Sequence, residues 1–105
     1  MLDQSKPAMP TYSFNVEGVT VNTFHIEKAG EGHPKHEHEY DHVTQVHCGR
    51  LLVTTPSVVF EMTKDTKPIK FPANEWHELE AMEDDTVFMN IFAVGKDAQK
   101  APTDM

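Results

Sequence analysis

The chain has 105 residues, which is enough for one domain with one hydrophobic core and too few for a second domain. Its formal net charge is −8, from 17 acidic and 9 basic residues, and no basic patch is visible. This charge argues against binding to nucleic acid and to an anionic membrane surface. The single cysteine, Cys48, excludes an internal disulfide framework and fits a reducing compartment.

Three segments follow from composition. Residues 1–10 contain two prolines and little that could pack, so we expect a tail, or an arm that pairs with another subunit. Residues 11–95 form the predicted barrel, and residues 96–105 a polar C-terminal tail. The N-terminus lacks the apolar stretch of a signal peptide, and no apolar run approaches the ~20 residues that span a bilayer. These features favour a soluble, cytoplasmic protein.

The dominant hydrophobic period between the predicted tails is two, and no segment keeps a helical repeat over three turns. Turn residues separate the short apolar segments at regular intervals. The predicted strands cover residues 12–16, 19–26, 33–38, 43–53 with a break at Gly49-Arg50, 58–60, 69–71, 75–82 and 86–94. About eight short strands predict an all-β sandwich or barrel, and a jelly roll suits this length.

Seven histidines are many for this length, and four of them have a notable spacing. His36 and His38 are two residues apart, so both side chains point to one face of an extended strand. His42 can rejoin that face, and a barrel can bring the distant His77 alongside. Neutral imidazole is a good ligand for divalent transition metals, so these four residues predict one metal site. Solvated histidines in an acidic loop are the alternative.

The first histidine segment has a recognisable spacing. It reads Gly30, five residues, His36-x-His38, three residues, His42, six residues and Gly49. This segment resembles the first motif of the cupin superfamily, which runs Gly, five residues, His-x-His, three or four residues, Glu, six residues and Gly. Every spacing holds, and His42 stands where the cupin glutamate is usual.

The second cupin motif centres on Pro-x-Gly-x-x-His and is only partly matched. The chain has Pro72 and His77 at the correct spacing, with Asn74 in the glycine position. Asparagine is the next most tolerant residue at positive φ, so we expect the turn to survive. Thr66 replaces the leading glycine of the motif, and Ala81 replaces its trailing asparagine.

The resemblance, which covers about residues 20–95, implies a double-stranded β-helix (jelly-roll) cupin barrel with one divalent metal near its centre. With His42 in place of glutamate, the chain looks like the small single-domain cupins with a four-histidine site. Manganese, iron, nickel, copper or zinc would then be the metal. Four neutral ligands leave the ion its full +2 charge, which favours an anionic ligand. The resemblance also implies a homodimer.

Other residues near the histidines have weaker assignments. Tyr40 lies between His38 and His42 and is the single candidate catalytic group. It could act as a proton donor or as a substrate stop at the mouth of the site. Its alternative role is to cap the loop. We expect His33 at the surface and His47 facing away from the metal. The predicted cavity lining comes from Thr44 and Val46 and from one of two alternating sets on the last strand, which are Phe88, Asn90 and Phe92 or Met89, Ile91 and Ala93.

Two classes of function stay open at this point. The first is a metal-dependent, dioxygenase-type oxidoreductase acting on a small enolisable or phenolic compound. The second is a non-catalytic cupin that binds or senses a small molecule, with a structural or ligand-holding metal. An isomerase or lyase is a weaker third option, because no strong general base is evident inside the predicted barrel. Both main classes require a small-molecule partner.

Overall fold

The structure is a computed structural model that describes residues 9–93. The predicted C-terminal tail at 96–105, and all but the last two residues of the predicted N-terminal tail at 1–10, lie outside these residues. The nine strands of the described part are β1 (Tyr12–Val16), β2 (Val19–Ile26), β3 (Gly32–His36), β4 (His42–Cys48), β5 (Leu51–Thr54), β6 (Val59–Met62), β7 (Ile69–Phe71), β8 (His77–Ala81) and β9 (Thr86–Ala93).

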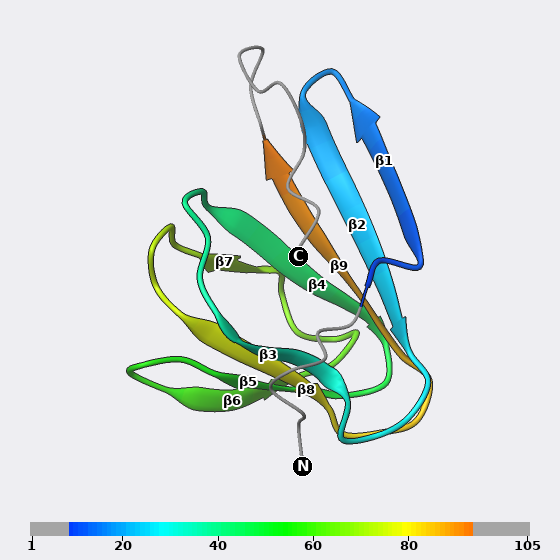
Figure 1. The fold of residues 1–105 in the computed structure, drawn as a ribbon. Helices are drawn as coiled ribbons and strands as arrows, with labels where there is room; N and C mark the ends of the chain where they lie inside the picture. The colour runs from blue at the N-terminus through cyan, green and yellow to red at the C-terminus, as the bar shows by residue number, and fades with distance from the viewer. Residues whose placement is uncertain (1–8, 94–105) are drawn as a thin grey trace.

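The strands form two antiparallel sheets that face each other (Figure 1). The first has the order β1-β2-β9-β4-β7, and the second has the order β3-β8-β5-β6. Neighbours in each sheet are mostly distant in sequence: β9 lies between β2 and β4, and β8 lies between β3 and β5. The prediction of an all-β fold built from short strands is therefore confirmed. In the described part of the chain, no helix is long and apolar enough to cross a membrane.

The core lies between the two sheets, because alternate side chains of each strand point inward. On β9 the inward set is Phe88, Asn90 and Phe92, each at most 2% exposed. On β4 the inward residues include Thr44 and Val46, as the sequence predicted. The buried hydrophobic residues are Phe24, Ile26, Val46, Leu51, Val53, Met62, Phe71, Leu79, Ala81, Phe88 and Phe92.

Candidate metal centre

The pairing of β3 with β8 brings together two histidines that are 41 positions apart. In the antiparallel register of these strands, His36 lies directly opposite His77. His38 follows two residues after His36, and its ring centroid lies 4.6 Å from that of His36. One ring nitrogen from each of His36, His38 and His77 can be chosen so that all three lie within 4.8 Å of one another. This triad is the geometric centre of the candidate site.

Backbone carbonyls fix the tautomers of two members of the triad. Nδ1 of His36 donates to the carbonyl oxygen of Pro34, and Nδ1 of His77 donates to that of Glu75 over 3.3 Å. A carbonyl oxygen can only accept, so each Nδ1 carries the hydrogen and each Nε2 keeps its lone pair. Both Nε2 atoms are buried and have no hydrogen-bond partner among residues 9–93. The two lone pairs are therefore available to a metal ion.

His42 reaches the same region from β4, but less closely. It is 2% exposed, and its ring centroid lies 5.0 Å from that of His77 and 5.4 Å from that of His38. Its ring stacks on Phe71 at 5.2 Å, and both ring nitrogens are buried without a partner in the described chain. His42 is not part of the group whose nitrogens all lie within 4.8 Å. The fourth ligand therefore stays a prediction.

Burial keeps two of these imidazoles neutral. Desolvation and, after it, the neighbouring histidines together lower the pKa of His77 and of His42 from 6.5 to about 3. Neutral imidazole is the form that ligates a metal. No carboxylate is buried in the described part of the chain. The donor set therefore suits a divalent transition metal and is unsuited to calcium or magnesium, which prefer oxygen ligands.

Two hydrogen bonds join the loops that carry the ligands. Asn74 has the left-handed φ of 64° that the sequence predicted for it. Its backbone N–H donates to the carbonyl oxygen of His38 over 2.7 Å. The Asp41 carboxylate accepts from the amide of Ala73 at 2.7 Å and pairs with Lys70 at 3.3 Å. The Ala73 hydrogen bond and then Lys70 lower the pKa of Asp41. Asp41 therefore ties the two ligand loops together.

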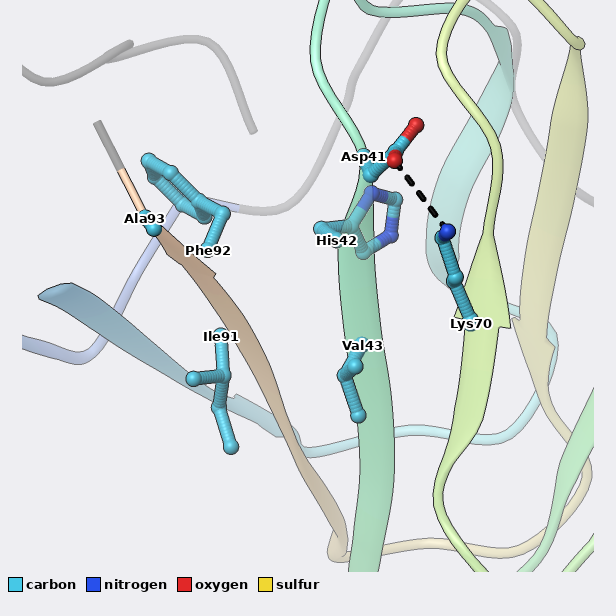
Figure 2. A pocket seen from close by; sticks show the side chains of 7 residues that line it. All are labelled: Asp41, His42, Val43, Lys70, Ile91, Phe92 and Ala93. Atoms are coloured by element: carbon cyan, nitrogen blue, oxygen red, sulfur yellow. Dashed lines mark ion pairs between the residues drawn. The ribbon is translucent and has the colours of Figure 1, made fainter. Parts of the chain in front are cut away.

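A pocket of about 380 Å³ opens beside His42 at the ends of β4 and β9 (Figure 2). Its wall is mostly apolar, with the Asp41–Lys70 ion pair on one side. Tyr40 is half-buried close by, stacked on His38 at 4.9 Å and 4.7 Å from Phe92. The residues that line the pocket are Asp41, His42, Val43, Lys70, Ile91, Phe92 and Ala93.

One site prediction is wrong. His33, expected at the surface, is fully buried: its ring lies 4.3 Å from Phe24 and 5.5 Å from His36. The register of β3 shifts between His33 and His36, so two residues at an odd separation both face inward. A period-two pattern without the bulge places His33 outside. His47 is exposed, as predicted.

Comparisons with known proteins identify the fold. No family model matches the chain, and no curated protein matches it. Among solved structures, the chain is similar to a cupin domain from Bordetella pertussis, with a TM-score of 0.63 and 26% identity over 83% of this chain and 93% of that one. A double-stranded β-helix protein from Klebsiella pneumoniae gives 0.66 and 12% identity, covering 86% and 79% of the two chains. KdgF from Halomonas sp. gives 0.67 and 17% identity, covering 83% and 78%.

Metal content should separate the triad from the other histidines. Replacing His38 or His77 by alanine removes a nitrogen of the triad, so we expect loss of stoichiometric metal. His47→Ala is the matched control, because this outward residue lies on the same strand as His42 and should leave one ion per chain. Elemental analysis of the purified variants provides the measurement. Stoichiometric metal in both triad variants would show that these histidines are not the ligands.

The metal-free protein should lose stability as the pH falls from 6.5 towards 5. Unfolded imidazoles bind protons near pH 6.5, whereas His42 and His77 in the folded state do so only near pH 3. Between pH 6.5 and 5, His42 and His77 should therefore each lower the free energy of unfolding by about 1.4 kcal/mol for every pH unit of decrease. Urea unfolding with a chelator present measures this slope, and His42→Gln should reduce it by about half. A free energy of unfolding that stays constant from pH 7 to 5 would contradict the assignment.

Proposed function

We propose that this chain, a cupin by its double-stranded β-helix fold, binds one divalent transition metal through His36, His38 and His77, with His42 as the fourth ligand. The observation that carries the proposal is the triad itself. Three imidazoles converge within 4.8 Å, and at least His36 and His77 present buried lone pairs that no donor among residues 9–93 satisfies. Leaving such groups unsatisfied costs about 1–3 kcal/mol each, and a bound metal removes that cost.

The proposed activity is dioxygenase-type oxidation of a small enolisable or phenolic compound. When bound, a divalent metal at neutral ligands supplies its full positive charge and open coordination positions. The absence of buried carboxylates among residues 9–93 supports a substrate that is itself acidic, because no Asp or Glu side chain in the described interior could take up its proton.

Tyr40 is the proposed gate residue of this site. Its ring stacks on His38 and packs against Phe92, so the side chain lies beside the triad. It lies farther from His42, with the ring centroids 6.5 Å apart. We assign it the role of a substrate stop at the mouth, with proton donation from its phenol as the catalytic role that the sequence suggested.

A non-catalytic binding or sensing cupin is the second candidate. The observation that favours it is the same lack of a buried acid or base apart from histidine in the described core. The metal would then hold a small anionic ligand without turnover. An isomerase or lyase has less support, because proton transfer needs a positioned general base. A cytoplasmic location stays a prediction from the sequence.

The homodimer is also a proposal, supported by the outer face of the β1–β2 hairpin. Tyr12, Phe14 and Val16 lie on one face of edge strand β1, and together with Val19 they are 40–60% exposed. Apolar side chains gathered on a sheet edge favour an interface.

Light scattering should give twice the 11.9 kDa chain mass. Phe14→Asp should reduce it to one chain mass, and the control Val59→Asp, an exposed valine on β6, should not. A wild-type monomer would refute the dimer.

Oxygen consumption separates the two functional classes. Protein reconstituted anaerobically with iron or manganese should take up oxygen on addition of pentane-2,4-dione or catechol, in proportion to the substrate lost. His77→Ala is the control for metal that is not bound at the triad. Tight binding of these compounds without uptake would replace the dioxygenase proposal with the binding cupin.

A further inference from the structure

A row of polar side chains crosses the inner face of the first sheet. The strand register places Asn90 of β9 between Asn22 of β2 and Thr44 of β4. All three residues are at most 2% exposed, in a layer bounded by Phe88 and Phe92 on β9. Burying polar groups in a hydrophobic core costs free energy unless they are hydrogen-bonded. The hydrogen bonds of these three side chains therefore show which polar groups still lack a partner.

Asn90 has one hydrogen bond and one unused donor. Its Oδ1 accepts from the Thr44 hydroxyl over 2.7 Å, which fixes the orientation of the amide. Its Nδ2 is buried and has no partner in residues 9–93. Asn22 differs, because its Oδ1 accepts from Ser13 towards the outer edge of the sheet. The side-chain amide of Asn90 is therefore an oriented hydrogen-bond donor inside the barrel, without an acceptor among residues 9–93.

The register also relates this donor to the histidines. Thr44 follows His42 by two residues on the same face of β4, which places it about 7 Å farther along the strand. Asn90 pairs with Thr44 and therefore lies one layer deeper than His42. Phe92 flanks Asn90 on the side of His42, and Phe88 flanks it on the other side. The Asn90 amide therefore lies between these two rings, one layer from His42.

We infer that Asn90 is a specificity-determining residue, which donates a hydrogen bond from Nδ2 to an oxygen at the inner end of a small planar ligand. The outer end of that ligand lies at the histidine triad, so the inference rests on the proposed metal-binding function. Thr44 acts as a positioning residue by holding the amide oxygen. The ligand class is a small aromatic or conjugated compound with oxygen atoms at both ends.

Two matched probes test this inference on zinc-loaded protein, which is redox-inactive. 4-Acetylcatechol has a carbonyl oxygen at the opposite end of the ring from its hydroxyls, and 4-ethylcatechol has a similar shape without that oxygen. Calorimetry gives the Kd of each probe. For each protein, the Kd of the ethyl probe divided by the Kd of the acetyl probe gives its preference for the acetyl probe. This ratio should be at least tenfold larger for the wild-type protein than for Asn90→Leu. The acetyl probe is the more acidic of the two, which changes its Kd for every variant alike. Comparing the ratio between variants therefore removes this effect. Asn22→Leu, the same change one strand away, should keep the wild-type preference.

A spectroscopic readout keeps the test independent of how well Asn90→Leu folds. The side-chain amide signal of Asn90 in the wild-type protein should shift with the acetyl probe and stay in place with the ethyl probe. Equal preferences in wild type and Asn90→Leu, with an unmoved amide signal, would overturn the inference and leave an ordered water as the partner of Nδ2. If zinc-loaded wild type binds neither probe, the proposed ligand-binding function itself fails, and the inference fails with it.

Discussion

The antiparallel pairing of β3 with β8 is the constraint on which the rest of the site depends. It places His36 opposite His77, inside a protein where water cannot reach their Nε2 atoms. The carbonyls of Pro34 and Glu75 take the Nδ1 hydrogens, so both lone pairs face the interior. Burial then keeps His77 neutral well below the usual pKa of histidine. A fold that hides unsatisfied imidazoles in this way needs an occupant for them.

The surrounding structure serves this arrangement from two sides. On the outer side, the amide of Asn74 and the carboxylate of Asp41 join the two ligand loops, so the triad does not depend on strand pairing alone. On the inner side, the first sheet supplies a layer with His42 and Phe92 and, beneath it, the polar layer with Asn90. The proposals for metal binding and for ligand selection thus fall on neighbouring layers of one barrel.

The sequence predicted the strands, the inward face of β4 and the positive φ at position 74, because each depends on local periodicity or turn chemistry. It left open which of two alternating sets on β9 faces inward, and the structure buries Phe88, Asn90 and Phe92. It also selected the three triad histidines from their spacing. It failed at His33, because a bulge in β3 changes the parity that alternation assumes. It could not pair Asn90 with Thr44 or Asp41 with Ala73, because those contacts depend on cross-strand register and loop closure. The separation of His42 from the triad is likewise set by tertiary geometry.

The most direct measurement of the central claim is anomalous diffraction at the absorption edge of the loaded metal. We expect one strong peak per chain, about 2.0–2.1 Å from Nε2 of His36 and of His77 and equally close to a ring nitrogen of His38. The distance from that peak to the nearer nitrogen of His42 would decide between three and four ligands. Peaks only at the exposed acidic residues, with none between these three rings, would contradict the metal centre.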